Sequence, residues 1–282
     1  MKKIIINADD FGLVQGVNEG IIKAHQEGIL TSATLMANMP GFYQAVDLAG
    51  TNPELGVGVH LNILRGQPLS PVKKVDSLLS KDLFFIPSVA SLLYRMTQRR
   101  VSFDEVEREF RAQVERILSA GINPSHIDSE KHIHLIRPLF RIVLKLAKEY
   151  KINKVRFIQE CCVSRRPGQM LKSMFISLSS ISMKKRMAQE GIRSSDRFHG
   201  VCDSGRISGV KLQKVLQSAK DGVTEIMVHP GFITQEMIEL EKQIGPYYIN
   251  KYREIELNAL LDEKLPDIIA GLRIQLINFN HI

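Results

Sequence analysis

The chain has 282 residues, 44% of them hydrophobic and 24% charged, with a formal net charge of +8. This composition is typical of a globular protein with enough length for a sizeable core. No run of about 18 apolar residues is present, which excludes a membrane-spanning helix. The basic surplus would suit nucleic acid, anionic lipid or an acidic substrate, but it is equally typical of a solvated surface.

The cysteines and the N-terminus bear on the compartment. Cys161, Cys162 and Cys202 form no CxxC pair, and an odd number argues against a disulfide framework. The chain reaches Asp9 and Asp10 before any apolar region long enough for a signal peptide. We therefore expect a cytoplasmic protein.

Short apolar runs alternate along the chain with stretches of helical periodicity. Strands are expected at residues 4–6, 30–39, 55–64, 154–160, 224–232 and 272–280, and residues 126–136 are expected to be a strand that runs into a loop. Helices are expected at residues 14–29, 42–53, 102–121, 138–152 and 247–265. In the clearest helix, Ser102 is a good N-cap and Glu105 completes a capping box. The alternation predicts an α/β fold, a single-domain (β/α) barrel of the TIM type over residues 1–282, closed or distorted.

Residues 161–198 interrupt this alternation. The segment is basic, rich in Met and Ser, and weakly periodic, so it predicts an inserted helical excursion over the sheet. One interpretation is a helical lid on the barrel rim with solvated basic residues. The other is a segment that shapes the substrate site and contacts an anionic membrane surface, because basic and apolar residues are interleaved in it.

Two neighbouring carboxylates, Asp9 and Asp10, follow the first expected strand. Like charges repel, so the pair needs a metal ion, a proton or a basic side chain to neutralise it. Acids in the first turn of a helix are the alternative explanation. His60 lies in an apolar strand, where it could be a metal ligand or a hydrogen-bonded core residue. His229 also ends an expected strand.

The stretch DSEKHIH is the most informative one. Its ionisable residues are Asp128, Glu130, His132 and His134, spaced by two, and in extended backbone they would share one face. Four such groups would be costly in a core, so a metal site or a solvated active site is predicted. Carboxylates and imidazoles at several strand ends form the ligand set of a divalent ion such as zinc or magnesium. One aspartate of the first pair would then hold the ion and leave the other free as a base.

The motifs NADDFGLVQGVNEGI, TSATLMAN, GVGVHLN, HIDSEKHIH, FHGVCDSG and IMVHPGF occur in this order. In this the chain resembles the YdjC-like carbohydrate deacetylases, which include chitooligosaccharide and hopanoid-biosynthesis deacetylases. The resemblance implies a (β/α) barrel and metal-dependent removal of an N-acetyl group from an amino sugar. It also implies that Asp9 is the catalytic base, that Asp10 and His60 are metal ligands, and that His229 protonates the leaving amine.

One position departs from the family pattern. The family usually has a histidine where this chain has Glu130, which we expect to be the third ligand; His132 is the alternative. A carboxylate there would shift the site toward Mg²⁺ or Mn²⁺ relative to Zn²⁺. His132 and His134 are expected to contact the substrate.

Two other functions remain open at this stage. A metal-dependent phosphoester hydrolase would use the same barrel, but the motifs lack a dense Arg/Lys cluster beside them. A catalytically inactive sugar-binding protein is the second alternative, and the intact Asp9–Asp10 pair argues against it. No dinucleotide-binding or P-loop motif supports nucleotide binding, and no nucleic-acid partner is expected. A homodimer is compatible with the resemblance.

Overall fold

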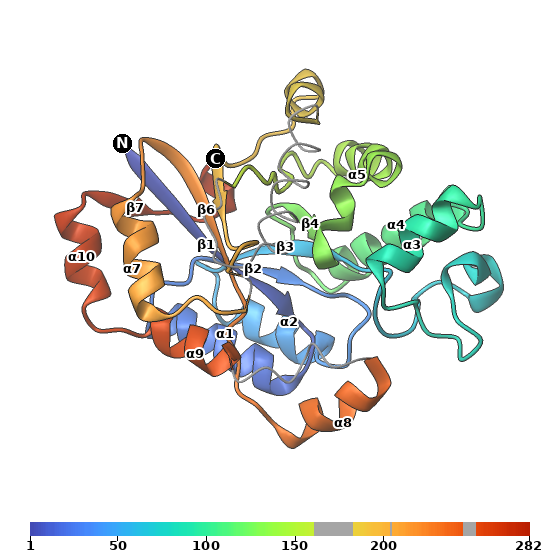
Figure 1. The fold of residues 1–282 in the computed structure, drawn as a ribbon, viewed down its shortest axis with the longest axis horizontal. Coiled ribbons are helices and arrows are strands. Elements are labelled where there is room, and N and C mark those ends of the chain that lie inside the picture. Colours follow the sequence, from blue (N-terminus) through green and yellow to red (C-terminus); the bar gives the residue numbers. More distant parts are fainter. Residues whose placement is uncertain (161–182, 204, 245–251) are drawn as a thin grey trace.

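The computed structural model describes residues 1–160, 183–203, 205–244 and 252–282 (Figure 1). Its parallel strands are β1 (Lys2–Phe11), β2 (Ser32–Leu35), β3 (Gly56–Leu61), β4 (Ile127–Ser129), β5 (Arg197–His199), β6 (Gly222–Val228) and β7 (Ile274–Leu276). Their order in the sheet is β4-β3-β2-β1-β6-β5, and β7 pairs with the first residues of β1. The central position of β1 places its carboxyl end in the middle of the curled sheet.

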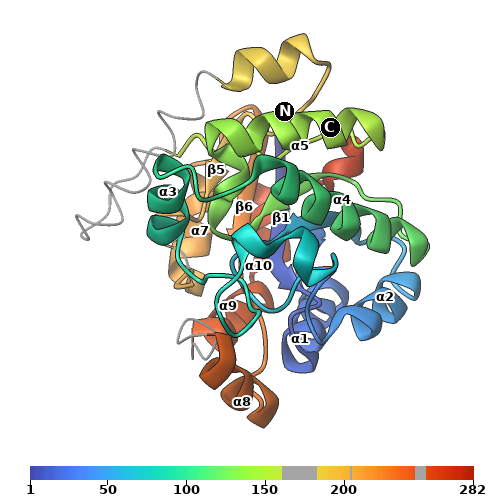
Figure 2. The same ribbon diagram turned by 90° about the vertical axis from the view of Figure 1, so that its right-hand side faces the viewer.

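Helices surround the curled sheet (Figure 2). They are α1 (Gln15–Gln26), α2 (Phe42–Gly50), α3 (Val89–Thr97), α4 (Phe103–Ser119), α5 (Arg137–Glu149), α7 (Gly209–Gln217), α8 (Gln235–Ile244), α9 (Tyr252–Leu260) and α10 (Leu265–Gly271). Short 3₁₀ segments lie at Val72–Lys74, Asp76–Leu78, Glu130–Leu135 and Phe279–His281. The α4 and α5 helices pack together on one side, and α1 packs against α2 and α9 on another (Figure 1).

The two end strands of the sheet are linked by residues 153–159. Val155 bridges to Ile127 in β4, and Lys154 bridges to Arg193 just before β5. The amide of Phe198 in β5 also donates to the carbonyl of Gln159. The expected strand at 154–160 is thus reduced to isolated bridges, and the expected (β/α) barrel is confirmed in a distorted form.

Local sequence explains the regular elements. Ile4, Ile5 and Ile6 are fully buried, as expected for a central parallel strand with both faces covered. The Ser102 side chain accepts a hydrogen bond of 3.4 Å from the amide of Glu105, so the predicted cap at the start of α4 is confirmed. The predicted capping box is wrong, because Glu105 Oε2 accepts from the Ser77 amide and the Ser102 amide donates to the Ser77 hydroxyl. The result is a rigid frame whose strands all point toward one rim.

The stretch 126–136 is predicted to be a strand that runs into a loop, and the strand ends earlier than a shared face for its four ionisable residues requires. Only Ile127–Ser129 is strand, and Glu130–Leu135 follows as a 3₁₀ segment. Lys131 and His132 have φ values of 48° and 60°, in the left-handed region. The idea that four ionisable side chains share one strand face is therefore wrong, because the backbone turns after Ser129.

The excursion lies largely outside the described residues, which resume at residue 183. Residues 183–189 are helical, and β5 (Arg197–His199) occupies the end of the range. Cys202 is disulfide-bonded, which runs against the expectation drawn from the odd cysteine number. Within the described part of the chain, no helix has the length and apolar character needed to cross a membrane.

Candidate active site

The candidate site lies at the carboxyl ends of the strands, as expected for this fold. Asp9 and Asp10 are near the end of β1, and His60 is the penultimate residue of β3. Glu130 directly follows β4, and His229 directly follows β6. Five residues singled out in the sequence are thus brought to one rim by four different strands.

A β-bulge explains how two consecutive carboxylates serve one site. The pairing of β1 with β2 shifts register between Ala8 and Phe11, and Asp10 has a φ of 69°. In a regular strand, consecutive side chains point to opposite faces, whereas a bulge redirects one of them. Asp9 and Asp10 each offer an oxygen within 4.8 Å of a ring nitrogen of His60.

The turn after this pair depends on Gly12. Its φ is 85°, and a Cβ atom there would lie 2.8 Å from the Leu35 Cδ1 atom. The Gly12 amide donates a 2.7 Å hydrogen bond to the side chain of Asn18 in α1. The glycine therefore lets β1 turn sharply into α1 beside the carboxylates.

Asp10, His60 and Glu130 form what we call the outer cluster. The His60 Nε2 atom lies 4.0 Å from Asp10 Oδ1 and 3.7 Å from Glu130 Oε2. Ligand distances of about 2.1 Å would place neighbouring tetrahedral donors about 3.4 Å apart, so a small contraction would satisfy a divalent ion. All three residues are at most 4% exposed. Two carboxylates and an imidazole fit Zn²⁺, Mg²⁺ or Mn²⁺ as a donor set.

An arginine contacts each carboxylate of the outer cluster. Arg253 Nη2 pairs with Asp10 Oδ2, and Arg65 Nη2 lies 2.6 Å from Glu130 Oε1. Burial alone would raise the pKa of Asp10, but the two guanidiniums outweigh it and hold that pKa well below its usual range. The pKa of Glu130 is also lowered, against burial, chiefly by Arg65. Both carboxylates are therefore ionised at neutral pH.

His60 is oriented from its other ring nitrogen. Its Nδ1 atom lies 2.7 Å from Asp128 Oδ1 and 3.1 Å from the Thr34 hydroxyl. A carboxylate on one nitrogen of a ligating histidine fixes the ring and leaves the other nitrogen for the ion. Burial disfavours the charged ring, but Asp128 raises the pKa of His60 well above its usual value.

Asp9, Arg156, Asp128 and Glu225 form an inner cluster beside the outer one. Arg156 is fully buried and donates to both oxygens of Asp9, at 2.8 and 2.7 Å. It also lies 2.6 Å from Asp128 Oδ2 and 2.6 Å from Glu225 Oε1. Burial would raise the pKa of Asp9, but Arg156 lowers it far below its usual range.

Asp9, His60 and Asp128 form a second set of donors close enough for an ion. This set is less suitable because both oxygens of Asp9 and one of Asp128 already contact Arg156. In addition, the Nδ1 atom of His60 is hydrogen-bonded to Asp128 itself. The outer cluster is therefore the better candidate for a metal site.

Glu225 differs from the other buried carboxyl groups of the inner cluster. Burial, together with the charge of Asp128, raises its pKa to about 7 even though Arg156 opposes the shift. Its Oε2 atom has no hydrogen-bond partner among the residues that the structure describes. Within the inner cluster, Glu225 is thus the carboxyl group whose pKa is moved toward neutral pH.

His229 is held at the rim by Glu256 from α9. Its backbone amide donates a 2.5 Å hydrogen bond to Glu256 Oε2, and its Nδ1 atom lies 3.7 Å from the same oxygen. Burial would lower the pKa of His229, but Glu256 raises it overall, with further help from Asp9 and Asp10. A cationic ring beside the carboxylate pair can serve as a proton donor.

His132 and His134 are separated by the left-handed turn. His134 is fully buried, with Nδ1 2.7 Å from the Ser129 hydroxyl and Nε2 3.2 Å from the carbonyl of Arg156. Burial and the nearby Arg156 lower its pKa to about 3. Both ring nitrogens thus have protein partners, which hold the ring against the loop. A contact of His134 with the substrate remains a prediction. His132 is 8% exposed, and its ring centroid lies 6.1 Å from that of Phe198.

The sequence analysis missed several charged residues that organise the site: Arg65, Arg156, Glu225, Arg253 and Glu256. One signal was available, because Arg156 and Glu225 interrupt the apolar runs KVRFIQE and TEIMV. A charge in a buried strand needs a partner of opposite charge, and this requirement predicts pairing without identifying the partner.

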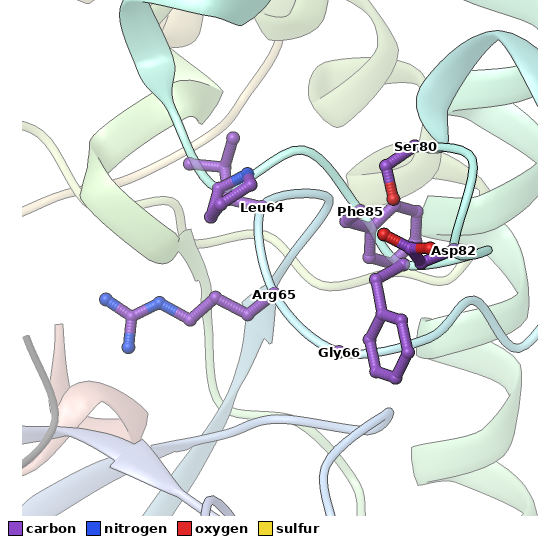
Figure 3. A pocket seen from close by; sticks show the side chains of 8 residues that line it. Leu64, Arg65, Gly66, Ser80, Asp82 and Phe85 are labelled. Atoms are coloured by element: carbon purple, nitrogen blue, oxygen red, sulfur yellow. The ribbon is translucent and has the colours of Figure 1, made fainter. Parts of the chain in front are cut away.

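A cleft of about 560 Å³ adjoins the outer cluster through Arg65 (Figure 3). It is lined by Leu64, Arg65, Gly66, Ser80, Asp82, Phe84, Phe85 and Pro87. In Figure 3 the Arg65 side chain extends away from Ser80 and Asp82. Its guanidinium pairs with Glu130, which Figure 3 does not draw. The cleft therefore offers apolar and hydroxyl-binding surface beside the candidate site.

Comparison with known proteins agrees with this architecture. Residues 3–271 match the family model described as YdjC-like protein. A carbohydrate deacetylase of Brevibacillus brevis is 36% identical over 281 residues, which cover 99% of each chain. A chitooligosaccharide deacetylase of Proteus mirabilis is 31% identical, covering 97% of this chain and 96% of that protein. A crystal structure from Enterococcus faecalis V583, whose description names cellobiose-phosphate cleavage, has a TM-score of 0.76 at 27% identity and covers 99% and 98% of the two chains. The chain belongs to the YdjC-like family.

Proposed function

We propose that this protein is a metal-dependent carbohydrate deacetylase that removes the N-acetyl group of an amino sugar in a chitooligosaccharide or a related glycan. The observation that carries the proposal is the convergence of Asp10, His60 and Glu130, with Asp9 beside them on the same bulge. The deacetylase names of two relatives that align over nearly their whole length support it.

Asp10, His60 and Glu130 would hold the ion, and the geometry favours Glu130 over His132 as the third ligand. A divalent ion supplies Lewis acidity, which makes water more acidic and polarises a carbonyl group. Zn²⁺, Mg²⁺ and Mn²⁺ all remain candidates for this chain.

Asp9 acts as the general base in this proposal. Arg156 keeps it ionised and fixes its orientation. Oδ1 accepts from both Arg156 and Asn7, whereas Oδ2 accepts one hydrogen bond from Arg156 and retains a second lone pair for the proton of the attacking water. Because Arg156 also lowers its basicity, Asp9 accepts that proton only from a water that has become acidic.

His229 donates a proton to the amine as the C–N bond breaks. Glu256 stabilises the cationic ring from the Nδ1 side, which leaves Nε2 to face the leaving group. Acetate and a free amino sugar are the products. His132 is retained as a proposed substrate contact, and contact of segment 161–198 with a membrane and homodimer formation remain predictions.

The structure adds little support for the alternative function, a phosphoester hydrolase. Arg65, Arg156 and Arg253 do lie at the site, which the sequence analysis did not anticipate. Each of them, however, already has a carboxylate partner, so the cluster carries little surplus positive charge for a phosphate group.

The test is acetate release from N-acetylated chitooligosaccharides by metal-stripped protein supplied in turn with Zn²⁺, Mn²⁺ or Mg²⁺. We expect equimolar acetate and free amine, with both lost on chelation. Hydrolysis of a phosphoester without acetate release would favour the phosphoesterase, and glycan binding without turnover would favour the binding protein.

A further inference from the structure

In each carboxylate of the outer cluster, one oxygen pairs with an arginine and the other oxygen faces His60. We propose that Arg65 is an internal counterion that competes with a divalent cation for the carboxylate of Glu130. The inference rests on the proposed metal site and adds a residue that sets its affinity.

The two oxygens of Glu130 have different partners. Arg65 Nη2 lies 2.6 Å from Glu130 Oε1, whereas Oε2 of the same carboxylate lies 3.7 Å from His60 Nε2. Arg65 is 7% exposed and Glu130 is 4% exposed. A guanidinium and an ion would thus share one carboxylate where little water screens their repulsion.

Charge balance points in the same direction. With Arg65 on Glu130 and Arg253 on Asp10, the two carboxylates are compensated without any ion. A buried carboxylate that loses its partner is strongly destabilising, so Arg65 stabilises the ion-free protein. Arg65 thus neutralises the charge that Glu130 brings into the buried cluster.

Binding of an ion therefore has to work against Arg65. Zinc titration of metal-stripped protein by calorimetry tests this directly. Arg65→Gln removes the cation and keeps a hydrogen-bond donor. We expect zinc to bind about tenfold more tightly, because the buried guanidinium no longer repels the ion. Arg111→Gln is the control, since Arg111 pairs with Glu107 and Glu149 on α4 and α5 and should leave zinc affinity unchanged.

Thermal unfolding gives an independent readout. Ion-free Arg65→Gln should melt several degrees below the wild type, and saturating zinc should raise its melting temperature by more than it raises that of the wild type. If Arg65→Gln does not fold, Arg65→Lys serves instead. The shorter lysine side chain moves its ammonium group away from Glu130 more easily, so the Arg65→Lys protein should bind zinc a few-fold more tightly than the wild type.

Zinc affinity that is unchanged in the variant would overturn the competition. Weaker binding would also overturn it and would make Arg65 a positioning residue that orients Glu130 for the ion. A wild-type protein that binds no divalent ion would overturn both this inference and the proposed function, whereas acetate release with unchanged affinity in Arg65→Gln would overturn this inference alone.

Discussion

Asp9 and Asp10 are neighbours in the sequence and belong to two differently built regions. In the inner cluster, Asp9 has both oxygens on one guanidinium, that of Arg156. In the outer cluster, Asp10 has one oxygen on Arg253 and the other 4.0 Å from His60 Nε2. The first carboxylate is held in a closed set of ion pairs, and the second has one donor oxygen left for an additional cation.

The difference shows that proximity alone does not assign roles in a cluster of acids. Both carboxylates lie near His60, and both are ionised. In the outer cluster, however, the oxygens that face His60 are not the ones paired with an arginine, whereas both oxygens of Asp9 are paired with Arg156. The inner cluster instead fixes charge and orientation. Substitutions in the outer cluster and in the inner cluster should therefore produce different defects.

The largest effect is expected from Asp10→Ala. Removing a donor oxygen from the outer cluster should abolish bound metal, measured by elemental analysis of the purified protein, and reduce deacetylation to background. Asp47→Ala, at an exposed position on α2, is the matched control and should retain both. Undiminished metal in Asp10→Ala would contradict the assignment of the outer cluster.

Asp9→Asn should separate the two regions most clearly. The amide keeps the size of the side chain but accepts no proton, so kcat should fall about 10²–10⁴-fold, the usual loss for a general base. Bound metal should stay at the wild-type level, because Asp9 belongs to the inner cluster. Loss of metal would instead favour the set of Asp9, His60 and Asp128, and near-normal turnover would exclude Asp9 as the base.

Glu225→Gln should change how the stability of the protein depends on pH, because Glu225 is the titrating carboxyl group of the inner cluster. The folded pKa of Glu225, about 7, lies above its ordinary value of 4.5, so the folded state binds the proton more tightly. This stability is present below about pH 4.5 and is lost as the pH rises to about 7, by about 3 kcal/mol in the free energy of unfolding.

Urea unfolding at pH 5 and pH 8 measures this difference. Glu225→Gln carries no titrating proton there, so its stability relative to the wild type should increase at pH 8. Glu263→Gln, at an exposed position, should follow the wild type at both pH values. Parallel pH profiles for wild type and Glu225→Gln would mean that Glu225 does not titrate in this range.

Much of the architecture could be predicted because it depends on local pattern. The Ser102 cap, the apolar run Ile4–Ile6 and the strand–helix alternation each reflect local interactions that hold in many tertiary contexts. The strand at 154–160 was predicted from the same kind of pattern, but it forms only isolated bridges because its neighbours in the barrel are irregular.

The barrel class and the strand ends that carry chemistry could be predicted from the sequence, because strand–helix alternation and residue type specify them. The resemblance to the YdjC-like deacetylases added Asp10, His60 and Glu130 as the candidate donors. The charged partners of these donors are known from the folded structure alone. The pairing of Arg253 with Asp10 joins residues 243 positions apart, and no local interaction encodes it. The turn at Lys131 and His132 likewise depends on backbone conformations that side-chain alternation does not reveal. Long-range charge pairs and left-handed backbone conformations form only when distant segments pack together. In this protein, both kinds of feature occur in the candidate site.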